Sequence, residues 1–271
     1  MPELPEVETT RRGIEPYVIG QSVREVRVRH RGLRWPVPDA LEGRLSGLTI
    51  LALQRRGKYL LFRTDGGVTL IVHLGMSGSL SLAADRLAGP HDHLDVLFGN
   101  GVRLRMRDPR RFGSVLLAEG DPREHPLLRD LGPEPFDSTF SGEYLYRIAK
   151  TRRVAVKQLL MDSKVVVGVG NIYANEALFL SGIRPTRPCH RISSARMLRL
   201  RDAVIEVLQS AIEQGGTTLR DFVREDGRPG YFAQRLRVYG RAGLPCLVCA
   251  EPIRQIRIGQ RSTYFCAVCQ T

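Results

Sequence analysis

The first residues of the chain combine a nucleophile with two acids. Removal of Met1, which a small following residue permits, would leave Pro2 with a free secondary amine. An α-amino group titrates near pH ~8, so much of it is an uncharged nucleophile at neutral pH. A secondary amine condenses with an aldehyde-type carbon to give a cationic iminium, which withdraws electrons. The carboxylates of Glu3 and Glu6 are close enough in sequence to move protons in such a reaction.

A helical pattern follows this terminus, from Val7 to Arg12, and Gly13 is expected to close it. Such a helix would anchor the N-terminus in one place. The alternative interpretation is an exposed, frayed terminus with no chemical role, which is common at chain ends.

Four cysteines near the end of the chain have the spacing of metal ligands. Cys246-x2-Cys249 is separated by sixteen residues from Cys266-x2-Cys269, a pattern typical of a tetrahedral zinc cage. In a four-cysteine site the protein fills all four coordination positions of the zinc. The ion would therefore stabilise the local fold and take no part in catalysis. The surrounding segment is too short for a hydrophobic core, so metal binding would supply most of its folding free energy. Cys189 is expected to be a core or surface residue.

The charge of the chain favours a polyanionic partner. Its 271 residues carry a formal net charge of +13, and phosphates of nucleic acid bind such surfaces by counterion release. An arginine-rich protein that is merely soluble is the alternative. Only four of the 41 basic residues are lysines: Lys58, Lys150, Lys157 and Lys164. Because arginine keeps its proton at any useful pH, a catalytic ammonium would have to be a lysine.

Composition also limits the cellular setting. A hydrophobic fraction of 42% is typical of a globular protein. No apolar run reaches the ~18 residues of a membrane span, and no signal peptide opens the chain. We therefore expect a cytoplasmic protein with reduced cysteines and no membrane partner, and nothing in the sequence demands more than a monomer.

The elements that must position these residues are predicted to be strands in the N-terminal half of the chain and helices after residue 135. Valine and arginine alternate over residues 26–29, and short apolar runs continue to residue 117, with a strong hairpin signal at Asn100-Gly101. Strands at this spacing are typical of a sandwich or barrel. Residues 132–135 read as a linker, and helices are predicted to begin near Asn171 and after Ser193 or Ser194.

Several longer motifs resemble the bacterial formamidopyrimidine-DNA glycosylase family, and the resemblance runs from end to end. The matching segments are Pro2–Thr9, the run around Lys58, His73–Gly78, Asp108–Gly113, Val167–Ala174 and the four cysteines. The related endonuclease VIII branch shares the architecture but usually has a glycine where Leu4 stands. We therefore favour the formamidopyrimidine branch.

The resemblance implies an α+β fold in three parts. An N-terminal β-sandwich with flanking helices is expected over residues 1–132 and a helix-two-turn-helix domain over residues 133–234. A four-cysteine zinc-finger hairpin is expected over residues 235–271, with one structural zinc ion as the cofactor. The loop Thr217 to Tyr231 corresponds to the family's lid over the flipped base.

The resemblance also implies an activity and assigns catalytic residues by matching positions. The family acts in base excision repair on double-stranded DNA, where it excises oxidised purines such as 8-oxoguanine and then cleaves the strand by β,δ-elimination. Pro2 matches the nucleophile that attacks C1′, and Glu3 matches the acid that protonates the ring oxygen. Lys58 matches the proton donor of β-elimination and Arg261 a residue of δ-elimination. Glu6 resembles a residue that orients the terminus.

Further positions match family residues that contact DNA. His91, Arg110 and Arg152 match positions that touch DNA, and Arg152 replaces the more usual lysine. Lys157 and Asn171 match residues that hold phosphates near the lesion.

The enzyme must turn the target base out of the duplex, and side chains must fill the gap. Met76, Arg110 and Phe112 match the family's inserting residues, although from sequence alone Met76 and Phe112 would more often belong to a core.

Two other functions and one other metal site are weighed against this hypothesis. A non-catalytic zinc-ribbon DNA-binding protein, such as a damage sensor, would explain the charge and the cysteines. It would give the N-terminal motif no function. The endonuclease VIII branch would act on oxidised pyrimidines. His91 and His93 flank Asp92, but no motif supplies a third metal ligand there, so we do not expect a metal at this pair.

Overall fold

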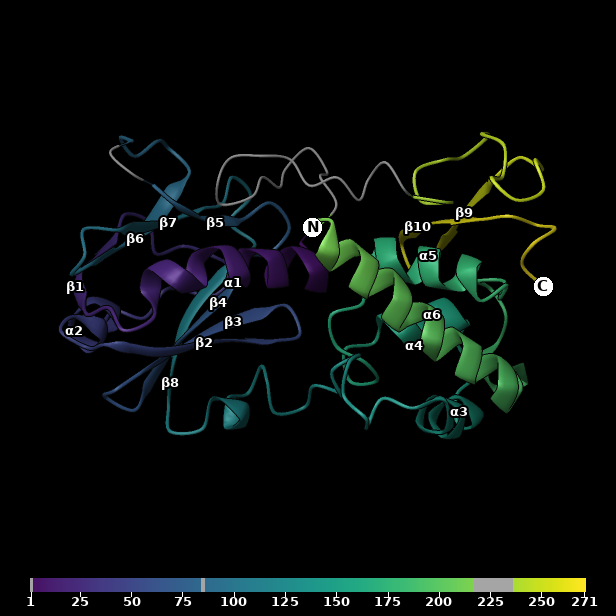
Figure 1. Ribbon diagram of the computed structural model, residues 1–271, viewed down its shortest axis with the longest axis horizontal. Coiled ribbons are helices and arrows are strands. Elements are labelled where there is room, and N and C mark those ends of the chain that lie inside the picture. The colour runs from purple at the N-terminus through teal and green to yellow at the C-terminus, as the bar shows by residue number, and fades with distance from the viewer. Residues whose placement is uncertain (1, 84–85, 217–235) are drawn as a thin grey trace. The chain divides into compact units, whose positions relative to one another are not determined.

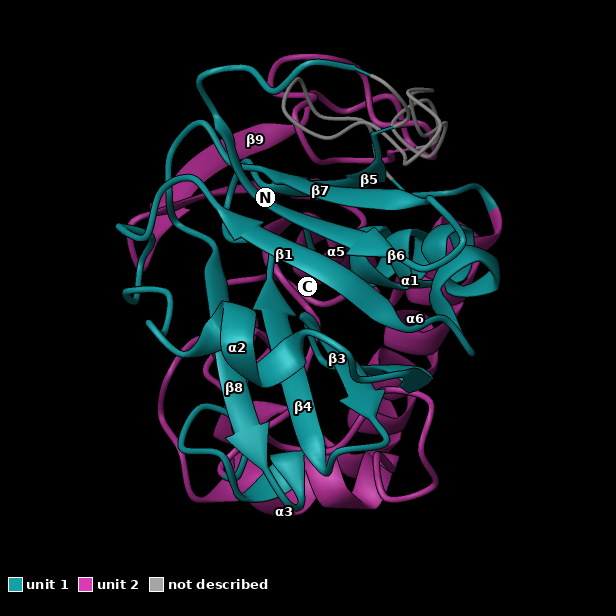
Figure 2. Cartoon of the chain, turned by 90° about the vertical axis from the view of Figure 1, so that its left-hand side faces the viewer, with its two compact units in different colours: residues 1–129, 214–231 teal, residues 130–213, 232–271 magenta. Residues whose placement is uncertain are grey.

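The computed structural model describes residues 2–83, 86–216 and 236–271. The chain divides into two compact units (Figure 2). Unit 1 comprises residues 1–129 and 214–231, and unit 2 comprises residues 130–213 and 232–271. Within the described residues, none of the helices combines the length and the apolar character that a membrane span requires.

Unit 1 contains two four-stranded antiparallel sheets and a long N-terminal helix (Figure 1). The first sheet has the order β1 (Val23–Val28), β6 (Asp92–Phe98), β7 (Arg103–Arg107), β5 (Ser79–Leu82). The second sheet has the order β2 (Ile50–Arg56), β3 (Tyr59–Thr64), β4 (Val68–His73), β8 (Ser114–Glu119). The remaining elements are α1 (Leu4–Val18), α2 (Leu41–Leu45) and a short 3-10 helix, η1 (Pro122–Glu124).

One hydrophobic core joins the two sheets and α1. Val26 of β1 and Met106 of β7 share it with Phe62 of β3 and with Val7 of α1. Each sheet therefore buries one face, as in a sandwich. The predicted turn at Asn100-Gly101 joins β6 to β7, and Gly101 has the positive φ of 83° that favours glycine there. The expected N-terminal β-sandwich is confirmed.

Helix α1 is longer than the sequence pattern predicts. It continues through Gly13 and Pro16 to Val18, so the prediction that Gly13 ends it was wrong. A glycine inside a helix destabilises it by about 1 kcal/mol relative to alanine. Because Ile14 and Val18 are fully buried in the core, their packing outweighs this loss.

Unit 2 is helical and ends in a β-hairpin (Figure 1). Its helices are α3 (Gly142–Lys150), α4 (Val156–Met161), α5 (Asn171–Leu180), α6 (Ser194–Glu213) and the 3-10 helix η2 (Cys189–Arg191). Its strands are β9 (Arg254–Ile258) and β10 (Arg261–Phe265), which pair antiparallel. The predicted helix starts near Asn171 and after Ser193 are both confirmed, and the α+β class is confirmed with them.

Candidate functional site

The N-terminal residues are held by the start of α1. Glu3 is the N-cap residue, and its backbone N–H donates to Oε2 of Glu6 at 2.8 Å in a capping box. Pro2, Glu3 and Glu6 are all buried, with Glu3 only 1% exposed. A Cβ atom on Gly216 would lie 3.2 Å from Oε1 of Glu6, so the chain also passes closely beside this carboxylate just before the expected lid. Residues 2–6 are therefore held in place and not frayed.

Lys58 lies in the tight connection between β2 and β3. The turn uses Gly57 at a φ of 56°, and the lysine side chain is half-buried. Tyr59 pairs with His73 across β3 and β4, and their ring centroids are 4.7 Å apart. Lys58 thus sits at the end of a rigid hairpin, a suitable position for a group that must meet a substrate atom repeatedly.

A buried ion pair ties the N-terminal helix to this hairpin. Oε2 of Glu8 on α1 lies 3.1 Å from Nε of Arg55 on β2, and each side chain is only 10% exposed. Burial by itself would raise the pKa of Glu8, but hydrogen bonds and ion pairs with Arg11, Arg12 and Arg55 outweigh it and hold the pKa below its usual value. This role of Glu8 was not predicted from the sequence. The helical spacing of Glu8 to Arg11 and Arg12 was the available signal.

His73 is kept neutral beside Lys58. Burial, together with the nearby cations Lys58 and Arg34, lowers its pKa to about 4. Its Nδ1 accepts the backbone N–H of Gly75 at 3.0 Å, a bond that only the unprotonated ring nitrogen can accept.

The expected wedge residues lie on two loops that share one buried carboxylate. Oδ1 of Asp108 accepts the hydroxyl of Ser77 at 2.9 Å, and Oδ2 accepts the N–H of Gly113 at 2.7 Å. Ser77 follows Met76 and Gly113 follows Phe112 in the chain, so Asp108 fixes both loops at once. A carboxylate without exposure to solvent must be fully hydrogen-bonded, which makes this anchor rigid.

The side chains that are expected to act as wedges lie outside the core. Phe112 is 42% exposed, and the guanidinium carbon of Arg110 lies 4.8 Å from the centre of its ring. Met76 is half-buried, and neither it nor Phe112 belongs to the core cluster. A large exposed aromatic ring on a fixed loop suits insertion between bases.

The two histidines of the pair have different surroundings. His91 is half-buried and lines a surface cleft with Arg111, so it is available to a ligand. His93 is buried, and its Nε2 lies 2.8 Å from the carbonyl oxygen of Asp108. We therefore describe His93 as part of the wedge-loop anchor.

In unit 2, Arg261 is presented by the tip of the hairpin. It is exposed and begins β10, directly after a two-residue turn in which Gly259 and Gln260 have φ values of 53° and 61°. Two successive positive φ values give the tight hairpin that matches strand twist. Nδ2 of Asn171, at the start of α5, donates to the carbonyl of Ser262 at 3.1 Å.

Lys157 and Arg152 both have partners within the protein, unlike cations that point freely into solvent. Lys157 is only 1% exposed, and its ammonium donates to the Ser262 carbonyl and the Thr263 hydroxyl. It therefore positions the hairpin, and a phosphate contact through it stays a prediction. Arg152 is half-buried and forms a 2.7 Å ion pair with Asp162, and its DNA contact also stays a prediction.

The four cysteines meet as the spacing predicts. The sulfurs of Cys246, Cys249, Cys266 and Cys269 all lie within 4.8 Å of one another, with two pairs 3.4 and 3.9 Å apart. A zinc ion with Zn–S bonds of ~2.3 Å needs tetrahedral edges of ~3.8 Å, so the group fits one structural zinc. The N–H of Cys269 donates to the Cys266 sulfur at 3.4 Å, a hydrogen bond that helps to orient this ligand.

The zinc-finger hairpin is also held by apolar packing and by hydrogen bonds. These contacts were not predicted from the sequence. Phe179 of α5 packs with Val238 and Ile253 and two of the cysteines in a small core. The buried carboxylate of Glu176 accepts three successive N–H groups of residues 237–239 at 2.8, 3.0 and 2.8 Å. The expected lid, Thr217 to Tyr231, lies outside the described residues.

Three family models match consecutive parts of the chain. They are the formamidopyrimidine-DNA glycosylase N-terminal domain at residues 1–115, the formamidopyrimidine-DNA glycosylase H2TH domain at residues 131–223, and a zinc finger found in FPG and IleRS at residues 243–271. The helical part of unit 2 therefore corresponds to a helix-two-turn-helix domain, as expected.

Curated relatives match over the full length. The chain is 58% identical to the formamidopyrimidine-DNA glycosylase of Methylococcus capsulatus and 57% identical to that of Thioalkalivibrio sulfidiphilus, with complete coverage of both chains in each case.

Solved structures match equally completely. MutM (Fpg) from Thermus thermophilus has a TM-score of 0.90 at 41% identity, covering 99% of this chain and 98% of that one. The Lactococcus lactis Fpg in complex with DNA containing an abasic site has a TM-score of 0.91 at 34% identity, with 99% of both chains covered. These matches, together with the placement of the N-terminal proline, the H2TH helices and the four cysteines, show that the chain belongs to the formamidopyrimidine-DNA glycosylase family.

Proposed function

We propose that the protein is a bifunctional DNA glycosylase and AP lyase that excises oxidised purines from double-stranded DNA. The observation that carries the proposal is the N-terminus of a chain of this family: Pro2 and Glu3 are held at the start of α1, and α1 is tied through Glu8 to the hairpin of Lys58. A nucleophile and an acid on such a rigid support meet the first requirement for catalysis at a sugar carbon.

The first half of the reaction removes the base. The free amine of Pro2 attacks C1′ of the deoxyribose, and the bond from C1′ to the damaged base breaks with its electron pair on the base. The proton lost by the attacking N–H neutralises the departing base, which restores the nitrogen lone pair. Glu3 donates a proton to the ring oxygen, the sugar opens, and the nitrogen lone pair forms the C=N bond of a cationic iminium. No metal or oxidant is needed, because the amine supplies both electrons.

The second half cleaves the strand. The iminium draws electrons from C2′, which loses a proton, and the C3′–O bond breaks so that the 3′ phosphate leaves. Lys58 supplies a proton during this β-elimination. In the δ-elimination that releases the 5′ phosphate, the Arg261 guanidinium keeps its proton and acts as a fixed positive charge on the departing phosphate.

DNA recognition uses side chains of different exposure, of which Arg110 is exposed and His91 and Arg152 are half-buried. His91, Arg110 and Arg152 contact the duplex, and Asn171 and Lys157 support the phosphates near the lesion. Phe112, Arg110 and Met76 fill the space left by the flipped base. The Lactococcus lactis relative is known in complexes with abasic-site DNA and with Fapy-dG-containing DNA, which supports this class of substrate.

The proposal includes the organisation of the protein. One zinc ion on the four cysteines holds the hairpin of Arg261 in place. The division at residues 132 and 234, the monomeric state and a location with chromosomal DNA in the bacterial cytoplasm belong to the same proposal.

Borohydride trapping tests the chemistry directly. Reduction of the iminium should leave wild-type protein covalently bound to a duplex containing 8-oxoguanine, whereas Pro2→Gly should lose most of the adduct. A form that retains Met1 or carries an N-terminal tag should bind DNA but neither trap nor cut. If the capped protein keeps its function, the protein is a non-catalytic DNA-binding module.

The substrate branch needs a separate comparison. Duplexes with 8-oxoguanine should be cut faster than duplexes with an oxidised pyrimidine, and the products should carry phosphates at both ends of the gap. Faster cutting of the pyrimidine substrates would assign the protein to endonuclease VIII chemistry.

A further inference from the structure

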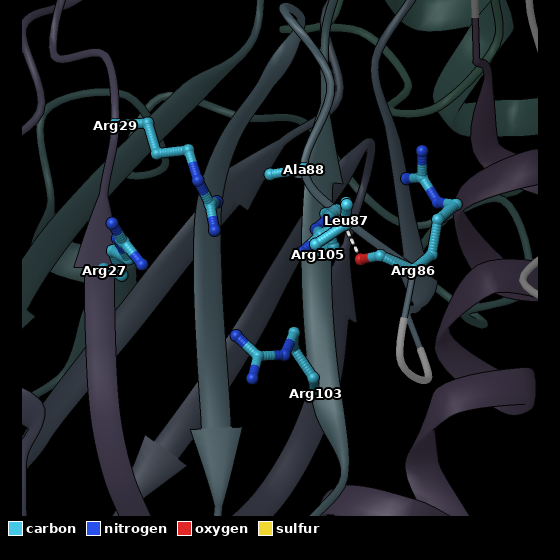
Figure 3. Close-up of a pocket in the computed structure, with 7 residues that line it drawn as sticks. All are labelled: Arg27, Arg29, Arg86, Leu87, Ala88, Arg103 and Arg105. Carbon is cyan, nitrogen blue, oxygen red and sulfur yellow. Dashed lines mark hydrogen bonds between the residues drawn. The ribbon is translucent and has the colours of Figure 1, made fainter.

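A pocket lined by arginines opens on the outer face of the first sheet in unit 1 (Figure 3). Its volume is about 330 Å³. Its lining, which we call the arginine pocket, consists of Arg27, Arg29, Arg86, Leu87, Ala88, Arg103 and Arg105. Arg27 on β1, and Arg103 and Arg105 on β7, alternate with Val26, Leu104 and Met106, which face the core. The pocket therefore lies on the opposite face of the sheet from the core.

A single buried carboxylate organises the pocket floor. Asp95 of β6, which is 1% exposed, accepts hydrogen bonds from Arg105 at 2.7 and 2.8 Å, from Arg29 at 2.6 Å and from Arg103 at 3.3 Å. Strand β6 lies between β1 and β7, so Arg27 and Arg103 stand on either side of it (Figure 3). Residues 86–88 form one wall of the pocket. This wall is held in place because Arg105 donates to the carbonyl of Arg86 at 2.8 Å.

The pocket has more positive than negative charge. Five guanidinium groups line it, and the carboxylates that pair with them, Asp92 and Asp95, are both buried beneath. Among the described residues, Arg27 is exposed and has no acidic partner, whereas Nη1 of Arg29 is buried and has no hydrogen-bond acceptor. Arg27 therefore offers N–H donors and positive charge to an anion on the solvent side of the pocket.

A second cleft adjoins the arginine pocket at Arg29. Arg29 lines both, and the second cleft, of about 460 Å³, is also lined by His91 and Arg111. Arg111 follows the wedge residue Arg110 in the chain. The positive surface therefore runs from the expected DNA contact at His91 onto the outer face of the sheet.

We propose that the arginine pocket binds a backbone phosphate of duplex DNA and extends the DNA-binding surface of unit 1 beyond His91. This inference rests on the proposed function for its partner. Guanidinium groups bind phosphate oxygens through paired N–H donors, and replacement of counterions by fixed arginines favours binding. Compact free polyphosphates share this chemistry, but the continuity with the His91 cleft favours a duplex.

The test measures how binding to an undamaged duplex depends on salt. The double variant Arg27→Ala with Arg103→Ala removes two pocket charges and leaves Asp95 paired with Arg29 and Arg105. Loss of one phosphate contact should make the slope of log Kd against log salt shallower by about 0.9. We also expect binding about fivefold to tenfold weaker at low salt, as one lost charge-assisted contact of about 1–1.4 kcal/mol would give.

Matched controls separate the pocket from general charge. Arg44→Ala with Arg123→Ala removes two exposed arginines of unit 1 that pair with Glu119 and Asp121 outside the pocket, and it should keep the wild-type slope. The double variant Arg27→Lys with Arg103→Lys should restore most of the slope, because lysine keeps the charge. Thermal unfolding of each variant shows whether it is folded.

Three results would overturn the inference. One is an unchanged slope in the alanine variant. Another is an equal change in the control outside the pocket, which would indicate long-range charge alone. The third is stabilisation of wild type, but not of the alanine variant, by pyrophosphate together with unchanged DNA binding, which would assign the pocket to a small free anion. Borohydride trapping by wild type reports on the proposed function separately, because the salt slope uses undamaged DNA.

Discussion

The buried ammonium of Lys157 lies 2.7 Å from the hydroxyl of Thr263, two residues beyond Arg261. A lysine on α4 thereby fixes the strand that presents the arginine at the hairpin tip. Asn171 of α5 adds a bond to the same segment through Ser262. The position of Arg261 therefore depends on two helices as well as on the zinc site.

Lys157→Met should destabilise the protein by roughly 1–3 kcal/mol, because it removes the ammonium that donates to the buried Thr263 hydroxyl and leaves the Ser262 carbonyl with Asn171 as its side-chain donor. It should also lower the ratio of δ- to β-elimination product, since Arg261 loses its support. Urea unfolding and gel analysis of the cut strand measure these two effects. Lys164→Met, which removes an exposed lysine, is the charge-matched control and should change neither. A normal product ratio in Lys157→Met would contradict the positioning role.

Cys249→Ser should lose the zinc ion and weaken DNA binding through the loosened hairpin. The small core around Phe179 should keep the rest of unit 2 folded. Metal analysis and binding at constant salt provide the readouts. Cys189→Ser is the matched control, because Cys189 donates to the carbonyls of Arg152 and Ala149 and a hydroxyl can do the same. It should retain one zinc per chain. Undiminished DNA binding by Cys249→Ser would argue against a hairpin that contacts DNA.

The stability of unit 1 should depend on the protonation of His73. Its folded-state pKa of about 4 lies below the ordinary value of 6.5, so its contribution is complete above pH 6.5 and is lost as pH falls toward 4. The shift corresponds to up to about 3 kcal/mol of unfolding free energy. Protonation would also remove the acceptor for Gly75 N–H, beside the Met76 loop.

Urea unfolding of wild type and His73→Gln between pH 4 and pH 7.5 tests this. Glutamine can still accept the Gly75 N–H but does not titrate, so the difference between the two proteins should shrink as the pH falls. Parallel curves over the whole range would show that His73 does not contribute.

Asp108→Asn should loosen both wedge loops. An amide offers only one oxygen where Ser77 and Gly113 need two, so one donor loses its partner, at a cost of about 1–3 kcal/mol. Base unstacking, followed with a fluorescent adenine analogue next to the lesion, should become slower and less complete.

Phe112→Ala provides the comparison for Asp108→Asn, because it removes a wedge side chain and leaves the loop anchor intact. We expect it to impair unstacking without lowering the unfolding free energy. Equal stability losses in both variants would mean that Asp108 is not the specific anchor.

Much of the architecture was predictable from local patterns. The valine–arginine alternation of residues 26–29, the turn at Asn100-Gly101 and the cysteine spacing each report on a few neighbouring residues, and each was placed correctly. The end of α1 was predicted wrongly at Gly13, because burial of Ile14 and Val18 overrides the weak local preference of a glycine.

The chemical groups can be read from the residue types and their spacing: a proline that can become a terminal amine, acids beside it, few lysines and four thiols at zinc spacing. How these groups are held depends on contacts between distant parts of the folded chain. The pairs Glu8–Arg55, Asp108–Gly113 and Lys157–Thr263 join residues from separate elements, and the arginines around Asp95 come from different strands. Such contacts leave no periodic trace in a sequence, because they depend on which surfaces pack together when the core forms.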